Sequence, residues 1–146
     1  MNRARVLIVD DEPDMLDNVT RVLTRAGHHC LAVSDPERAL QMIDTERPDM
    51  VLTDLKMPRV DGMEVLKAAR QADSCLPVII MTAHGSIESA VEAMRQGAFH
   101  YVTKPVNNEE LRLVVERGLA QRVRALENVN LRGQLQSTYH FDNILG

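Results

Sequence analysis

Residues 5–13 read RVLIVDDEP, and the interpretation of the chain starts from this stretch. Its four successive apolar residues are typical of a strand that is covered on both faces of a parallel sheet. Two acidic residues, Asp10 and Asp11, follow directly, and Pro13 is well placed to begin a helix. The stretch therefore predicts a buried strand, an acidic turn and a helix.

The same alternation of strand and helix continues along the chain. Strands are expected at residues 5–9, 30–33, 50–53, 77–81 and 100–103. Amphipathic helices are expected between them, with starting signals at Pro13, Asp35–Pro36, Asp61–Gly62, Ser86 and Asn107. Five such units predict an α/β fold of the flavodoxin-like (βα)5 type. This is a doubly wound, five-stranded parallel sheet in the order 2-1-3-4-5, with helices on both faces.

Composition excludes several classes of protein. The chain has 146 residues, 45% of them hydrophobic, and a net charge of −4, which suits one globular domain. It has no apolar run long enough for a membrane span or a signal peptide, so we expect a soluble cytoplasmic protein. Its acidic balance and lack of Trp argue against direct nucleic-acid binding. Cys30 and Cys75 are too far apart for a Cys-x-x-Cys motif, and we expect both thiols to stay reduced.

The last helix is expected to continue beyond the domain body, which we place at residues 1–120. Leu119, Val123 and Leu126 follow the four-then-three spacing of a coiled-coil seam, and Asn130 falls at the next seam position. The pattern favours pairing with a second copy, although a surface helix leading into a linker has the same spacing. Gly133 then interrupts the seam pattern. Because the helix continues past the body, residues 121–140 are assigned to a helical, coiled-coil linker.

Polar residues stand at the carboxyl ends of four predicted strands. Asp10 and Asp11 follow the first strand, Asp54 the third, Thr82 the fourth and Lys104 the fifth. In an open parallel sheet, ligands bind at these ends, beside the point where the strand order reverses. For the order given above, that point lies between the first and third strands. The spacing therefore predicts one crevice that holds all three carboxylates.

Three clustered carboxylates repel one another unless a cation lies among them. Mg²⁺ suits such an oxygen-rich site, and with a nearby lysine it would attract a phosphoryl group. One carboxylate would then act as a nucleophile and form an acyl phosphate. A simpler reading of residues 10–13 is that they only cap the first helix. The joint placement of polar residues at four strand ends favours the phosphate-handling site.

These residues belong to segments that together resemble the receiver domain of two-component response regulators. The resemblance covers about residues 4–120. The segments are VLIVDDEP at 6–13, VLTDLKMPRVDG at 51–62, IIMTAHG at 79–85 and YVTKP at 101–105.

The resemblance implies that Asp54 accepts a phosphoryl group from a sensor histidine kinase. It also implies that Asp11 and Asp54 hold Mg²⁺ with the backbone carbonyl of Lys56, while Asp10 assists directly or through water. The chain would then be mainly a signalling switch. It would catalyse only its own phosphotransfer and dephosphorylation.

The same resemblance assigns the switch itself. Thr82 and Lys104 would contact the phosphoryl group, and Tyr101 would turn inward as Thr82 moves. This movement would change the surface formed by the fourth helix, the fifth strand and the fifth helix, where we expect a homodimer to form together with the linker helix. The seam is compatible with phosphorylation either making or breaking that dimer. The peptide bond before Pro105 is usually cis in the family.

The segment from Thr82 to Pro105 and the terminal FDNILG at 141–146 are similar to the NtrC-like subfamily. That likeness implies a larger regulator that acts on sigma-54 RNA polymerase. Residues 141–146 would begin an AAA+ ATPase domain, with a DNA-binding domain beyond it. The chain itself has no Walker A loop and no helix-turn-helix, so neither activity is expected of it.

Two alternatives remain at this stage. A Mg²⁺-dependent phosphatase of the haloacid-dehalogenase type also uses an aspartate at a strand end, but it requires a second aspartate two residues later. Lys56 occupies that position here. The other alternative is a pure dimerisation module with a vestigial acidic pocket.

Overall fold

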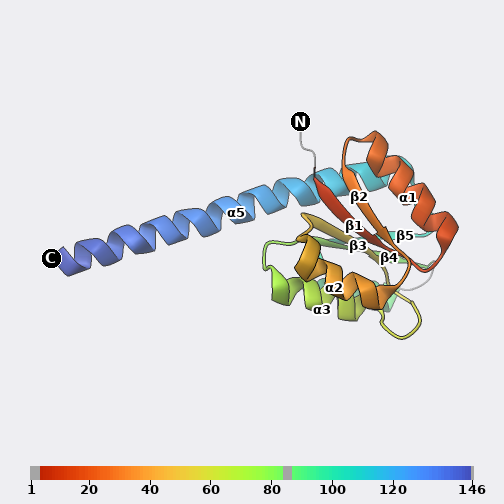
Figure 1. The fold of residues 1–146 in the computed structure, drawn as a ribbon, viewed down its shortest axis with the longest axis horizontal. Coiled ribbons are helices and arrows are strands. Elements are labelled where there is room, and N and C mark those ends of the chain that lie inside the picture. The colour runs from red at the N-terminus through yellow and green to blue at the C-terminus, as the bar shows by residue number, and fades with distance from the viewer. Residues whose placement is uncertain (1–3, 84–86, 146) are drawn as a thin grey trace.

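A parallel five-stranded sheet lies between two layers of helices in the computed structural model (Figure 1). The structure describes residues 4–83 and 87–145, and for residues 130–145 it describes the backbone alone. The strands are β1 Arg5–Val9, β2 His29–Val33, β3 Met50–Asp54, β4 Val78–Thr82 and β5 His100–Thr103. The helices are α1 Pro13–Arg25, α2 Pro36–Glu46, α3 Gly62–Ala72, α4 Ile87–Arg95 and α5 Asn108–Leu145.

The strand order is β2-β1-β3-β4-β5, and every neighbouring pair is parallel. This confirms the flavodoxin-like order predicted from the sequence. Helices α1 and α5 cover one face of the sheet and α2 and α3 the other, while α5 extends far beyond the body (Figure 1). The order reverses between β1 and β3, so their carboxyl ends border the crevice expected of such sheets.

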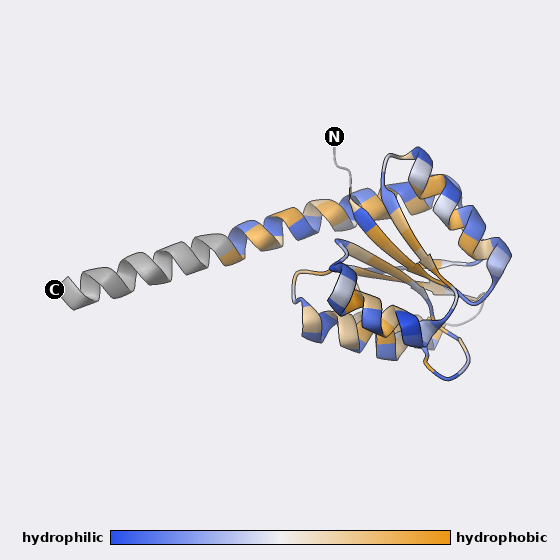
Figure 2. Cartoon of the chain, viewed as in Figure 1, coloured by the Kyte–Doolittle hydropathy of each residue, from blue (hydrophilic) through white to orange (hydrophobic). Residues whose placement is uncertain are grey.

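Each face of the sheet has its own hydrophobic core. Alternate strand residues point to opposite faces, as Leu7 and Val9 do on one side and Val6 and Ile8 on the other. Figure 2 shows hydrophobic strands and helices whose outward faces are hydrophilic. Strands β3 and β4 are buried along their whole length. The sheet is therefore a rigid support for the side chains at its edge.

Helix-capping signals in the sequence are mostly confirmed. Asp35 and Asp61 accept hydrogen bonds from backbone N–H groups in the first turns of α2 and α3. Asn107 Oδ1 accepts one from the Glu110 backbone, as its spacing predicted. Ser86, the expected cap of α4, lies outside the described residues.

Several element boundaries differ from the prediction. β2 begins one residue earlier, at His29, and β3 and β4 end one residue later, at Asp54 and Thr82. β4 begins at Val78 rather than Pro77, because proline has no N–H to donate to the ladder; its carbonyl still accepts from Val51. Helix α5 continues through Gly133 to Leu145 without a break. A glycine inside a helix costs only about 1 kcal/mol relative to alanine, so flanking helix-forming residues carry the helix through it.

The structure also bears on two predictions made from composition, which concern membrane-spanning segments and the two cysteines. Within residues 4–83 and 87–145, no helix is both long and apolar enough to cross a membrane. Cys30 and Cys75 are both free thiols.

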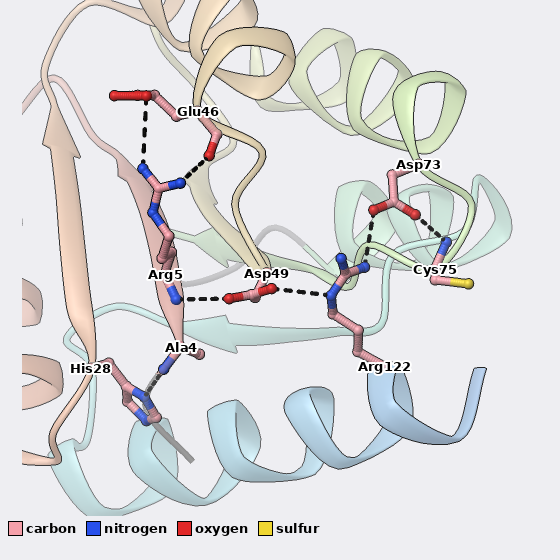
Figure 3. Close-up of polar contacts among 8 residues, drawn as sticks. All are labelled: Ala4, Arg5, His28, Glu46, Asp49, Asp73, Cys75 and Arg122. Atoms are coloured by element: carbon pink, nitrogen blue, oxygen red, sulfur yellow. Dashed lines mark hydrogen bonds and ion pairs between the residues drawn. The ribbon is translucent and has the colours of Figure 1, made fainter. Parts of the chain in front are cut away.

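His28 is buried in the turn before β2, and its Nδ1 accepts a hydrogen bond from the Ala4 backbone at 3.3 Å (Figure 3). Burial lowers the pKa of His28, although the nearby Glu116 carboxylate partly opposes this. The unfolded chain therefore takes up the proton more readily, and folding stability falls as the pH drops through about 6.5.

We expect His28→Gln to lessen the loss of stability between pH 8 and pH 5, because glutamine takes up no proton in that range and the lowered pKa of His28 then costs nothing. Urea unfolding at both pH values measures this difference. The matched control is His29→Gln, which changes an exposed neighbour and should keep the wild-type pH dependence. Equal pH dependence in the wild type and His28→Gln would contradict the assignment.

Candidate functional site

The site lies at the carboxyl edge of the sheet, where three strand ends meet. Asp10 directly follows β1, Asp54 ends β3 and Lys104 directly follows β5. The backbone at this edge is fixed by the ladder: Asp10 donates to Val33 O at 3.2 Å, and Lys104 donates to Thr82 O at 2.7 Å. The peptide bond between Lys104 and Pro105 is cis.

The ammonium group of Lys104 lies among three carboxylates. Its Nζ is 3.1 Å from Asp10 Oδ2, 3.2 Å from Asp54 Oδ2 and 3.7 Å from Glu12 Oε1. The lysine side chain is only 13% exposed. Burial by itself would lower the pKa of Lys104, but contacts with Asp10 and Asp54 outweigh it and raise that pKa. The lysine therefore stays charged and acts as a fixed counter-ion.

Asp10 is fully buried, at 0% exposure. Its Oδ1 accepts a hydrogen bond from the Glu12 backbone at 2.9 Å. Its Oδ2 lies 3.1 Å from Lys104 Nζ in an ion pair and has no hydrogen-bond partner among the described residues. A buried carboxylate oxygen without a hydrogen bond is costly, and a bound cation would satisfy it.

Asp54 carries the largest electrostatic cost at the site. Burial and, after it, the charge of Asp10 raise its pKa from 3.8 to about 6, while Lys104 acts in the opposite direction. Two carboxylates and one lysine leave an excess negative charge in a place that water reaches poorly. At neutral pH Asp54 is ionised and under-compensated, which is a favourable state for a nucleophile or a metal ligand.

The donor set fits a hard divalent cation. Asp10, Glu12 and Asp54 each offer a carboxylate oxygen, and these oxygens lie within 4.8 Å of one another. Oxygen ligands of this kind, together with the unpartnered oxygen of Asp10, suit Mg²⁺. Asp11, which the sequence predicted as a ligand, is exposed and does not belong to this group, and Lys56 is exposed as well.

Sequence reasoning missed Glu12. Its backbone is the N-cap of α1, but its side chain makes no capping hydrogen bond. The side chain instead contributes to the acidic group around Lys104. The simple capping interpretation of residues 10–13 therefore does not describe what these carboxylates do. The sequence did contain a signal for Glu12. It lies in a short turn between a strand and a helix, and such a turn places several consecutive side chains near the same strand end.

The remaining residues singled out from the sequence lie around this group. Thr82 ends β4 and is buried, in register with Thr103 of β5. Tyr101 lies on β5 and is half-buried against the hydrophobic core below α2 and α3.

Gly62 explains why the loop after β3 can fold so closely over Asp54. Its N–H donates to Leu55 O at 2.7 Å. A Cβ at this position would collide with the Asp54 carbonyl and lie 2.8 Å from Leu55 Cα. Any larger residue would push the β3–α3 loop away from the backbone that carries Asp54.

Comparison with known proteins shows which family has a sequence similar to this chain. Residues 6–116 match the model of the response regulator receiver domain. The chain is 40% identical over 145 residues to the regulatory protein AtoC of Escherichia coli K12, covering 97% of this chain and 31% of AtoC. It is 38% identical to the DNA-binding transcriptional regulator NtrC of the same strain, covering 91% of this chain and 29% of NtrC. The chain thus spans about a third of these relatives.

Solved structures give the same picture. NtrX from Brucella abortus superposes with a TM-score of 0.85 at 34% identity, over 94% of this chain and 33% of NtrX. The isolated receiver domain of the same NtrX has a TM-score of 0.75 at 37% identity, over 79% of this chain and 98% of that domain.

Replacing Asp54 tests whether its ionised carboxylate lowers the stability of the folded protein. Because its pKa is raised, the cost of ionising Asp54 is absent below about pH 4 and fully present above about pH 6. Asp54→Asn should therefore stabilise the Mg²⁺-free protein at pH 8 by roughly 1 to 2 kcal/mol, since one pKa unit is about 1.4 kcal/mol and partial solvent access reduces it. At pH 4 the gain should vanish.

Denaturant unfolding at the two pH values measures the gain, with exposed Asp44→Asn as the control. Excess Mg²⁺ should stabilise the wild type and leave Asp54→Asn nearly unchanged. A destabilised Asp54→Asn at pH 8 would contradict the assignment of Asp54 as an under-compensated charge.

Proposed function

Since this chain belongs to the response regulator receiver domain family, we propose that it is a phosphorylation switch whose acceptor is Asp54. Its relatives include NtrC-like transcriptional regulators of two-component systems. The observation that carries the proposal is the buried contact between the Asp54 carboxylate and Lys104, 3.2 Å apart, beside a second buried carboxylate. A sensor histidine kinase in the cytoplasm is the proposed phosphoryl donor.

In the proposed reaction, an oxygen of Asp54 attacks the phosphorus of a phosphohistidine in line with the P–N bond. The new O–P bond forms an acyl phosphate as the P–N bond breaks. The electron pair of that bond goes to the imidazole, which takes up a proton. Lys104 offers its ammonium group to the phosphoryl oxygens and neutralises charge as it develops.

Mg²⁺ is the proposed cofactor, and when bound it would neutralise charge on the phosphoryl oxygens. Asp10 and Asp54 would hold it together with the backbone carbonyl of Lys56, and the exposed side chain of Asp11 would turn toward the ion to join them. The orphaned oxygen of Asp10 supports this assignment. Glu12 lies close enough to assist as an outer ligand.

The switch would run from the acceptor to the surface around α4, β5 and α5. Thr82 would donate its hydroxyl to a phosphoryl oxygen, and Tyr101 would move inward in response. Exposed apolar side chains lie on this surface and on the emerging α5: Ile87, Val91, Met94, Leu113, Val123, Leu126 and Val129. Such a surface favours a homodimer that pairs through these elements and the linker helix.

We propose that the chain is divided into three parts. Residues 1–120 would form the receiver, 121–140 the helical linker and 141–146 the start of an AAA+ domain. In a longer regulator, the switch would control the AAA+ domain and, through it, a DNA-binding domain. The receiver and its linker helix would not themselves bind nucleic acid.

The comparisons lend no support to the two alternatives. The family match covers residues 6–116 and concerns receivers, and Lys56 occupies the position where a haloacid-dehalogenase enzyme needs its second aspartate. A dimerisation module with a vestigial pocket would not need a buried lysine held between two carboxylates.

Intact-mass measurement tests the acceptor. Incubation with Mg²⁺ and acetyl phosphate should add one phosphoryl group to the wild type and none to Asp54→Asn. Lys104→Met, which removes the cation but keeps a long side chain, should be phosphorylated roughly 10- to 1000-fold more slowly. Asp44→Asn should behave as the wild type.

Three outcomes would contradict the proposal in different ways. An adduct that persists in Asp54→Asn would place the acceptor elsewhere. Steady release of phosphate from ordinary phosphomonoesters would indicate a phosphatase. The complete absence of an adduct, with the fold intact, would favour the dimerisation module.

A further inference from the structure

Arg122 lies on α5 at the edge of the sheet opposite the phosphoryl site. It follows Leu119, which is the last residue of α5 that belongs to the buried core. Its side chain is only 14% exposed, which is low for an arginine on a helix that is leaving the body. The arginine therefore marks the root of the protruding part of α5.

The guanidinium of Arg122 bridges two carboxylates that come from different layers of the fold. Nη1 donates to Asp73 Oδ2, at the end of α3, at 3.0 Å. Nε is 3.5 Å from Asp49 Oδ1, directly before β3. Figure 3 shows the arginine between the two aspartates. We call this group the Arg122 clamp, consisting of Arg122, Asp49 and Asp73.

Both aspartates are themselves held by backbone donors. Asp49 Oδ2 accepts from the Arg5 backbone at 2.9 Å, and Asp73 Oδ1 accepts from the Cys75 backbone at 2.9 Å (Figure 3). Each carboxylate thus uses one oxygen to fix its own position and the other to contact Arg122. Because the guanidinium is planar and rigid, contact with two fixed carboxylates also fixes its direction.

Among the side chains of α5 that the structure describes, none beyond Leu119 belongs to the buried core. A cavity of about 270 Å³ lies beside the helix here, with Gln121 and Ala125 forming part of its wall. The opposite wall includes Arg70 of α3 and Phe99 before β5. Farther along, Val123 and Val129 are exposed. Beyond Leu119, the side-chain polar contacts that join α5 to the body, within the part of the chain that the structure describes, are those of Arg122 with Asp49 and Asp73.

We propose that the Arg122 clamp sets the direction in which α5 leaves the receiver body. With the clamp intact, the helix and the body move as one unit. With the clamp released, the helix pivots over the cavity about the root near Leu119. Arg122 is thus a positioning residue for the linker and takes no part in phosphoryl chemistry.

The consequence for signalling rests on the proposed function. If two chains pair along α5, the direction fixed by Arg122 determines how the two bodies face each other. With the clamp intact, a change at the α4–β5–α5 surface would then move the linker helix in one direction. With the clamp released, the same change would leave the direction of the helix undefined. The clamp itself, however, requires neither phosphorylation nor pairing.

Distance measurement between two spin labels tests the proposal. Nitroxides are attached at Thr45→Cys on α2 and Asn128→Cys on α5, both exposed positions, in a chain carrying Cys30→Ala and Cys75→Ser. Excess unlabelled protein removes distances between copies. The parent should give one narrow distribution, and Arg122→Ala one roughly twice as wide, as local restraint is lost.

The controls separate the clamp from a general effect on the helix. Arg124→Ala removes an exposed arginine whose hydrogen bond goes to Gln121 on the same helix, and it should keep the narrow distribution. Arg122→Lys should broaden it, because one ammonium does not span two carboxylates as a guanidinium does. Asp49→Asn with Asp73→Asn should broaden it as well, with no further effect of Arg122→Ala on top.

A narrow distribution in Arg122→Ala, with unchanged circular dichroism, would overturn the proposal. Acetyl-phosphate labelling of the same variants distinguishes this result from failure of the proposed function. Labelling should proceed on Asp54 in Arg122→Ala at the wild-type rate. If the distance distribution broadens in Arg122→Ala but acetyl phosphate does not label the parent, the proposal for the Arg122 clamp is supported. The proposed phosphorylation switch is then overturned.

Discussion

The contact between the Lys104 ammonium and the buried carboxylates of Asp10 and Asp54 is the interaction on which the site depends. A carboxylate with no exposed surface is tolerated because a cation lies 3.1 Å away. Burial and the charge of Asp10 raise the pKa of Asp54 to about 6, and Lys104 only partly opposes them, so the group retains affinity for further positive charge. Binding of a dication and reaction with a phosphoryl group both follow from that imbalance.

The sheet makes this imbalance possible. Strands β1, β3 and β5 are far apart in the sequence, yet their parallel order brings their carboxyl ends to one edge. Buried ladder hydrogen bonds hold the backbone there, and Gly62 lets the following loop approach Asp54 closely. The opposite edge uses the same chemistry for another purpose, since Arg122 also lies between two carboxylates but ties a helix to the body.

Much of the fold was accessible from the sequence, because buried parallel strands give continuous apolar runs and proline and glycine mark the helix ends. The strand order and the meeting of Asp10, Asp54 and Lys104 followed from those patterns. Glu12 and Arg122 did not, since their roles depend on side-chain directions that spacing alone does not reveal. The helical linker expected at residues 121–140 runs through Gly133 in the structure, because a single glycine weakens a helix without ending it.

The central claim is that Asp54 is a carboxylate whose charge is only partly compensated until a divalent cation binds. Carbon-13 NMR of the Asp54 carboxyl group across a pH titration, with and without Mg²⁺, tests it most directly. The account predicts titration near pH 6 in the metal-free protein, moving well below that value when Mg²⁺ is present. A titration at the ordinary value of 3.8 without metal, or one that Mg²⁺ leaves unchanged, would contradict it.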